Sequence, residues 1–254
     1  MKSWRETKRR KRAQRALERQ LAYQEEKSER LRGHEPDVVQ AMMRASEKVR
    51  STLEKFQTID PNVRVVEVGS GAHGLIFFFG SKRPVGVDPL AHQYASLFPK
   101  WQTRVPTIAA VGETLPFPDR SFDIVLCDNV VDHAESPARI VSELVRILAP
   151  NGLLYFTVNV HHPIYAIAAA LHSSWNSLGV PCEIGPFADH TTHLTLSRAR
   201  QLFQSLPLRV LSESSNLAEA RTVAKKRPAR HPGDILKRLF FKNALYQIIA
   251  IREG

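Results

Sequence analysis

Short apolar runs alternate with amphipathic stretches through the central part of this 254-residue chain. Runs rich in β-branched residues predict strands, and apolar residues at helical spacing predict helices. The predicted strands cover residues 63–68, 85–87, 107–111, 122–127 and 153–158, and the helical segments between them cover 74–79, 89–98 and 137–148. This alternation predicts an α/β fold with a doubly wound, mostly parallel sheet and helices on both faces.

The first 60 residues have a different pattern and are expected to form a helical extension. Residues 1–32 contain no Pro or Gly, and their few apolar positions fall near helical spacing, which predicts one long helix that ends at Gly33. A second helix is expected from Pro36 to Phe56. The turn-forming residues 60–62 separate this extension, residues 1–60, from a main domain over 61–254.

The pattern loosens after Val160. Helices are predicted at 163–178 and 197–206, strands at 208–214 and 244–251, and loops at 179–193 and 225–232. With the five earlier strands, the last two complete a predicted seven-stranded sheet.

A glycine-rich turn follows the first predicted strand. Gly69, Gly71 and Gly74 allow the backbone to turn sharply and to approach a ligand closely. Their spacing fits the dinucleotide fingerprint. Asp88, 19 residues after Gly69, is expected to end the second strand, where a carboxylate accepts hydrogen bonds from ribose hydroxyls. NAD and S-adenosylmethionine both contain an adenosine, so these features fit either ligand.

Glu67 distinguishes between the two ligands. It lies two residues before Gly69, at the tip of the first strand, where its charge would repel a pyrophosphate. The sulfonium and ammonium groups of S-adenosylmethionine are cationic, and a carboxylate favours them.

Three further motifs follow in the same domain. They are Gly112-Glu113-Thr114-Leu115-Pro116-Phe117-Pro118-Asp119-Arg120-Ser121-Phe122-Asp123, Cys127-Asp128-Asn129-Val130-Val131-Asp132-His133 and Leu148-Ala149-Pro150-Asn151-Gly152. Together with the glycine turn and Asp88, they resemble the class I S-adenosylmethionine-dependent methyltransferases of the methyltransferase domain 11 type, which include enzymes of quinone biosynthesis. The resemblance covers residues 63–160. It departs from the family in a glycine turn one residue longer than usual and in Val111, where an acid is common.

The resemblance implies a Rossmann-like fold, S-adenosyl-L-methionine as the cofactor, and a role for each matched position. The implied cofactor-binding residues are Glu67, Gly69, Ser70, Gly71 and Gly74 at the methionine part, Asp88 and Pro89 at the ribose, Gly112, Glu113 and Thr114 at the adenine, and Asp128, Asn129 and His133 at the pocket edge. Residues 61–160 would be the cofactor-binding half and 161–254 the substrate-side half. The extension over 1–60 would form part of a lid.

Histidines gather in the sequence after the fifth predicted strand. They are His161, His162, His172, His190 and His193. Methyl transfer is an in-line displacement, but a hydroxyl acceptor must also lose a proton, for which histidine is a suitable base. We rank His193 first as this base, then His133 and His162. The alternative is that each caps a helix or satisfies a loop carbonyl. A metal site at Asp189, His190 and His193 is disfavoured, because a loop with this spacing fixes no ligand geometry, and no metal is expected.

The net charge of +11 is concentrated at the two ends of the chain. Residues 1–33 hold 12 Lys and Arg against 5 Asp and Glu, and residues 219–254 hold 9 against 3, while the residues between them hold 15 against 17. Such ends permit contact with nucleic acid or an acidic surface through 1–33 and 221–242. A solvated helix and a solvated loop explain the charge equally well.

No apolar run approaches the ~20 residues that span a bilayer, and no apolar segment follows the basic N-terminus as in a secretory signal. Cys127 and Cys182 are the only cysteines, and neither has a CxxC partner. We therefore expect no transmembrane segment and a reducing, cytoplasmic setting.

The leading interpretation is an S-adenosylmethionine-dependent methyltransferase that acts on the oxygen of a small or lipid-linked metabolite. An RNA methyltransferase is the first alternative. The basic ends favour it, whereas the lack of a recognisable RNA-binding module and of the Asn/Asp-Pro-Pro-aromatic motif opposes it. Two further classes stay open, namely a non-catalytic nucleoside-binding adapter that acts through the basic N-terminal helix, and an NAD-dependent oxidoreductase.

Overall fold

The structure is a computed structural model, and it describes residues 2–134, 136–164, 193–226, 228 and 243–254. Its helices are α1 (Lys2–Leu31), α2 (Glu35–Glu54), α3 (Ala91–Leu97), α4 (Pro99–Gln102), α5 (Pro137–Ile147), α7 (Leu196–Gln201) and α8 (Leu217–Lys226), with two short 3-10 helices, η1 (Leu75–Phe78) and η2 (Val131–His133). Its strands are β1 (Arg64–Val68), β2 (Arg83–Val87), β3 (Thr107–Ile108), β4 (Phe122–Asp128), β5 (Leu148–Val160), β6 (Leu208–Ser215) and β7 (Ala244–Arg252).

The seven strands form one sheet in the order β3-β2-β1-β4-β5-β7-β6. All neighbouring strands pair in parallel except β7, which runs antiparallel to both β5 and β6. The predicted doubly wound, mostly parallel sheet is therefore confirmed. The strand order reverses between β1 and β4, and ligands of such sheets bind beyond the carboxyl ends of the strands at that point.

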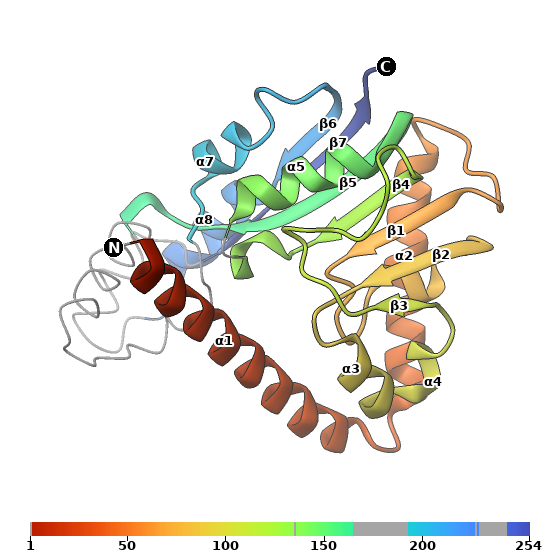
Figure 1. Ribbon diagram of the computed structural model, residues 1–254, viewed down its shortest axis with the longest axis vertical. Helices are drawn as coiled ribbons and strands as arrows, with labels where there is room; N and C mark the ends of the chain where they lie inside the picture. Colours follow the sequence, from red (N-terminus) through yellow and green to blue (C-terminus); the bar gives the residue numbers. More distant parts are fainter. Residues whose placement is uncertain (1, 135, 165–192, 227, 229–242) are drawn as a thin grey trace.

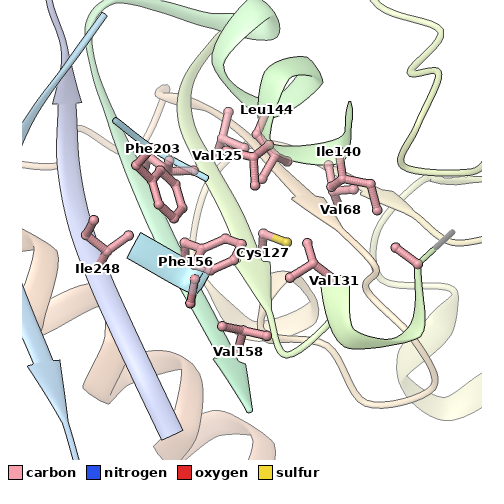
Figure 2. Packing of buried hydrophobic residues seen from close by; sticks show 14 of the residues in the cluster. Val68, Val125, Cys127, Val131, Ile140, Leu144, Phe156, Val158, Phe203 and Ile248 are labelled. Atoms are coloured by element: carbon pink, nitrogen blue, oxygen red, sulfur yellow. The ribbon is translucent and has the colours of Figure 1, made fainter. Parts of the chain in front are cut away.

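Residues along the central strands alternate between two apolar clusters, one on each face of the sheet. Val65 and Tyr155 contribute to the cluster that packs under α2, η1, α3 and α4. Val66 and Phe156 contribute to the cluster under α5, α7 and α8. Figure 2 shows this second cluster, with Leu144 of α5 above the central strands. Each central strand is therefore buried on both faces, which accounts for its nearly continuous apolar sequence.

Helix α1 runs along the side of the sheet where β1, β4 and β5 end (Figure 1). Its residues Leu17, Leu21 and Leu31 pack against the cluster that α2 and α3 also cover. The long first helix and its stop at Gly33 are confirmed, and Gly33 adopts a φ of 87° that suits glycine. No helix in the described part of the chain is long and apolar enough to cross a bilayer.

Several predicted boundaries were wrong. Strand β3 ends at Ile108 rather than at residue 111, because only its first two residues pair with β2 and Val111 is exposed. Strand β5 begins at Leu148 and accommodates residues 149–152 as a bulge opposite Asp123, so this run does not interrupt the strand.

Two helices also differ from the prediction. Helix α7 ends at Gln201, five residues before the predicted end, and turns complete the segment. Helix α8 was not predicted, and its last turn contains Lys225 and Lys226, for which the sequence predicts a loop. The predicted helix at 163–178 and the loop at 179–193 fall almost entirely outside the described residues.

Candidate functional site

The carboxyl end of β1 places a carboxyl group in the core. Glu67 is 1% exposed, and its Oε2 accepts a hydrogen bond of 2.8 Å from the backbone N–H of Ile76. Burial raises the pKa of Glu67 to about 8, and the nearby carboxylates of Asp128 and Asp88 act in the same direction. None of the groups that determine the pKa of Glu67 is a cation, so its charged form has no cationic partner among them.

The glycine turn follows directly and depends on two glycines for different reasons. Gly69 has a φ of +79°, and a Cβ at this position would overlap the side chain of Val130. A Cβ on Gly74 would lie 2.5 Å from Oε2 of Glu67. Ser70, which is buried, donates its backbone N–H to the carbonyl of Val87 at 3.0 Å, and this bond ties the turn to β2.

Asp88 lies at the end of β2, as predicted, and contacts the same turn. Its Oδ2 accepts a hydrogen bond of 3.0 Å from the N–H of Gly71, and its Oδ1 accepts one of 2.9 Å from the N–H of Leu90. Burial raises the pKa of Asp88, whereas these two bonds lower it. Each oxygen keeps a lone pair for a further donor. Pro89, which follows, is half-buried beside it.

Side chains of helix α4 hold the glycine turn through hydrogen bonds. This contact was not predicted from the sequence. Trp101 donates its Nε1–H to the carbonyl of Ala72 at 2.7 Å. Gln102 donates its Nε2 to the carbonyls of Gly71 at 2.9 Å and Ala72 at 3.0 Å. Both side chains are buried. The burial of Gln102 is known only from the structure, so the surrounding sequence carries no signal for this role.

His73 occupies the position that makes the turn longer than the usual family pattern. Its ring lies 4.8 Å from that of Phe98 and 5.4 Å from that of Trp101, measured between centroids. Burial lowers the pKa of His73 to about 4, and the charge of Lys27 on α1 adds to the effect. His73 is therefore neutral near pH 7.

The segment after β3 is held against α5. The backbone N–H of Leu115 donates to Oε2 of Glu143 at 2.8 Å, and Oε1 of Glu113 accepts from the N–H of Ser136 at 3.3 Å. A Cβ on Gly112 would lie 3.0 Å from Cδ1 of Ile140. Thr114, which is exposed, accepts a long hydrogen bond of 3.5 Å from Arg139. Gly112, Glu113 and Thr114 thus form one supported loop at the edge of the site.

Two polar residues of β5 orient the end of β4. Thr157 donates its hydroxyl to Oδ1 of Asp128. Asn129 has a φ of 58°, and its Oδ1 accepts hydrogen bonds from the backbone N–H of Asn159 at 3.1 Å and from its Nδ2 at 2.6 Å. Burial raises the pKa of Asp128. Thr157 and Asn159 were not predicted as site residues, although two polar residues at alternate positions in an apolar strand are a readable signal.

The structure separates the three candidate bases. His193 lies beside His161 at the end of β5, with ring centroids 4.9 Å apart, and the N–H of His161 donates to the carbonyl of Leu194 at 2.7 Å. His162 lies close enough to Arg221 of α8 for that charge to lower its pKa, although burial is the larger cause. The backbone of His133 ends η2, and its side chain is outside the described part.

The described residues contain no group of three His, Cys, Asp or Glu side chains that could hold a metal ion. Asp189 and His190, the other members of the disfavoured metal site, lie outside the described residues.

A cavity of about 610 Å³ lies at the end of the sheet away from the glycine turn, where the parallel strands begin. Its basic lining residues are Arg64, Lys82, Arg83 and Arg104. Arg64 is paired with Asp123, whereas Lys82 and Arg83 are exposed. This basic groove is separate from the carboxylates at the other end of β1 and β2.

Residues 66–156 match the model of the methyltransferase domain family. These residues therefore form a domain of the methyltransferase type. The matched segment runs from β1 to β5 and includes the glycine turn, Asp88 and Asp128.

Curated relatives agree with this assignment over part of the chain. An uncharacterized methyltransferase of Mycolicibacterium gilvum is 32% identical over 102 residues, which cover 39% of this chain and 40% of the relative. The thiol S-methyltransferase TMT1B of Rattus norvegicus is 33% identical over 82 residues, which cover 30% of this chain and 34% of the relative. The chain thus spans less than half of the length of these curated relatives.

Solved structures extend the similarity in fold to most of the chain. The YcgJ protein of Bacillus subtilis has a TM-score of 0.56 and 18% identity, and the match covers 82% of this chain and 99% of that one. The geranyl diphosphate C-methyltransferase of Streptomyces coelicolor, solved with S-adenosyl-L-homocysteine, has a TM-score of 0.54 and 15% identity, with 85% and 82% covered. At these identities the similarity is one of fold alone.

Proposed function

We propose that the protein transfers a methyl group from S-adenosyl-L-methionine to the oxygen of a small or lipid-linked metabolite. The observation that carries the proposal is the set of three carboxyl groups, Glu67, Asp88 and Asp128, around the glycine turn at the carboxyl ends of β1, β2 and β4. Their mutual repulsion and burial disfavour three negative charges, so a cationic ligand is favoured there. S-adenosylmethionine supplies an electrophilic methyl group on such a cationic centre.

The matched residues fit this cofactor in the order that the family resemblance implies. Glu67 and the glycine turn would face the methionine part, and Asp88 would accept the ribose hydroxyls. The supported loop at 112–114 would lie at the adenine. Asp128 and Asn129 would edge the pocket, held in place by β5. The chain's contribution to transfer is alignment of the acceptor with the methyl group.

For an oxygen acceptor we propose His193 as the base, ahead of His133 and His162. Its support is its place at the end of β5, beside His161, because the carboxyl ends of the strands are where acceptors of such sheets bind. The pKa of His162 is lowered by burial and by the charge of Arg221, so it is a weaker base and a weaker candidate. Replacement of the true base by alanine should lower turnover ~10²–10⁴-fold with little change in cofactor affinity. Near-parental turnover in all three single variants would indicate an acceptor that needs no base.

Calorimetry with S-adenosylmethionine, S-adenosylhomocysteine and NAD tests the proposal at the level of the cofactor. We expect saturable heat with the first two ligands and little with NAD. Tight NAD binding without a response to S-adenosylmethionine would remove the proposal. Binding without methyl transfer to any acceptor fraction would favour the non-catalytic adapter.

RNA is a second candidate acceptor. The basic groove with Lys82 and Arg83 adds cations from the domain itself to those of the chain ends. Backbone phosphates are attracted by such positive surfaces. Transfer of a labelled methyl group to total RNA but not to extracted metabolites would favour this candidate over the first.

A further inference from the structure

Helix α1 faces the domain with a stripe that is apolar at its ends and polar in its middle. The stripe consists of Leu17, Leu21, Gln24, Lys27 and Leu31, spaced three or four residues apart. Such spacing places all five on one side of a helix. The three leucines pack against the apolar cluster of the domain, as an ordinary amphipathic helix would. Gln24 and Lys27 stand where two more apolar residues would complete that packing.

Gln24 is buried without a complete set of partners. It is 7% exposed, and its Oε1 has no hydrogen-bond partner within the described part of the chain. A buried acceptor left without a donor costs about 1–3 kcal/mol, so leucine at this position would favour folding. A polar group at this buried position is therefore better explained by a ligand than by packing.

The surroundings of the stripe are those of the candidate site. Lys27 lies close enough to His73 of the glycine turn for its charge to lower the pKa of that ring. About two turns before Lys27, Gln20 forms a side-chain hydrogen bond with Tyr94, whose pKa is raised by burial and by the charge of Asp88. Helix α1 therefore passes beside His73 of the glycine turn and beside Tyr94, consistent with its path past the strand ends (Figure 1).

A second buried polar atom comes from the glycine turn. Nε2 of His73 has no hydrogen-bond partner among the described residues, and the ring is neutral near pH 7. An amide oxygen on α1 and a neutral imidazole in the turn both lack partners, and both kinds of atom can accept a hydrogen bond from an ammonium group. Lys27 adds a positive charge that suits a carboxylate.

We propose that Gln24 and Lys27 of α1 bind the amino-acid end of S-adenosylmethionine. Lys27 pairs with the cofactor's carboxylate, and Gln24 accepts a hydrogen bond from its ammonium group, with His73 as a further acceptor. This inference rests on the proposed function. It assigns α1 a share in cofactor recognition, so the N-terminal extension is part of the binding site rather than an appendage.

The test compares two ligands that differ in this end alone. S-adenosylhomocysteine carries the amino-acid group, whereas 5′-methylthioadenosine lacks it. Gln24→Leu and Lys27→Met in the full chain should each weaken S-adenosylhomocysteine about tenfold or more, as expected for a charge-assisted bond, and leave 5′-methylthioadenosine within about twofold. The ligand-free Gln24→Leu protein should unfold at an equal or higher temperature than the parent, because an unsatisfied group is removed.

Exposed residues of the same types provide matched controls. Gln14→Leu on α1 and Lys48→Met on α2 should leave both affinities unchanged. Parental affinity for S-adenosylhomocysteine in both test variants would overturn the inference and leave the proposed function standing. Equal loss for both ligands would also overturn it, because α1 would then act on the pocket as a whole. A parent that binds neither ligand would instead contradict the proposed function.

Discussion

At the scale of single residues, the site is defined by carboxyl groups in surroundings that oppose their charge. Glu67 is enclosed at the end of β1 and receives only backbone N–H groups. The two carboxylate oxygens of Asp88 accept hydrogen bonds from the backbone N–H groups of Gly71 and Leu90. These carboxyls therefore affect both the stability of the protein and its affinity for a cation.

Glu67 should make stability fall as pH rises. Its pKa is about 8 in the folded protein against an ordinary value of 4.5, so the folded form holds a proton that the unfolded form has lost between these values. Relative to Glu67→Gln, the parent should lose up to about 1.4 kcal/mol of unfolding free energy per pH unit in this interval. Urea unfolding at pH 5.5 and pH 8.5 measures the difference. Glu47→Gln, an exposed control, should follow the parent; the same behaviour in Glu67→Gln would contradict the argument.

Asp88 should contribute to ribose binding in addition to holding the turn. Asp88→Ala should weaken S-adenosylhomocysteine by ~1.5–3 kcal/mol, because a charge-assisted pair of hydrogen bonds is removed. Titration calorimetry at a temperature where the variant remains folded gives the affinity, and thermal unfolding reports the separate effect of removing the bonds to Gly71 and Leu90. A variant that binds as tightly as the parent would show that Asp88 is not the ribose ligand.

The residues that we propose to contact the ligand were easier to identify from the sequence than the residues that position them. Glu67, Gly69 and Asp88 follow a spacing that the chemistry of the turn requires, so the sequence alone indicated them. Thr157 and Gln102 act through other residues, on Asp128 and on the turn. Their partners lie about 30 positions away in the chain. The alternate polar positions of β5 can be read from the sequence, but local periodicity does not identify the partner that such a residue contacts.

At the scale of elements, the short helix α4 has an effect larger than its length suggests. Its three side-chain hydrogen bonds to the carbonyls of Gly71 and Ala72 fix a segment that has no regular structure of its own.

The prediction of elements from periodicity failed at two places. Helix α8 has one buried residue, Ala224, and so weak an apolar face gave no helical signal. In β5 the turn-forming Pro150-Asn151-Gly152 became a bulge, because pairing with β4 on both sides keeps the strand continuous.

Removal of the hydrogen bonds from α4 should loosen the turn. Gln102→Leu leaves the carbonyl of Gly71 without its side-chain donor and weakens the support of Ala72, which Trp101 retains. We expect a loss of about 1–3 kcal/mol in unfolding free energy and weaker binding of S-adenosylhomocysteine. Chemical unfolding and calorimetry measure the two effects. Thr103→Ser, an exposed change in the next residue that keeps the hydroxyl and its hydrogen bond to a backbone carbonyl of α4, should alter neither. An unchanged Gln102→Leu protein would show that the Gln102 bonds are dispensable.

At the scale of the whole molecule, the doubly wound, mostly parallel sheet with helices on both faces was predicted, because alternation of strands and helices is a property of the entire chain. Residues 1–60 were expected to form part of a lid, but the packing of α1 beside the glycine turn was not predicted. Its composition is that of a solvated basic helix, and only three leucines indicate that one side is packed. The fold therefore brings residues of the first 33 positions to the glycine turn, and the basic extension has an inward face in addition to its charge.

The charge at the start of α1 can be tested without disturbing its inward stripe. Lys8, Arg9, Arg10 and Lys11 precede Leu17, so their joint replacement by glutamine should leave affinity for S-adenosylhomocysteine unchanged. If RNA is the acceptor, removal of each phosphate contact should reduce the slope of log affinity against log salt by about 0.7 for single strands. Binding of a labelled single-stranded RNA at several salt concentrations measures this slope. If the parent binds RNA and the substituted protein shows the same slope, the phosphate contacts lie elsewhere. The groove at Lys82 and Arg83 is then the next candidate. If the parent does not bind RNA, the basic residues at the start of α1 are solvated side chains without an RNA partner. The metabolite is then favoured as the acceptor.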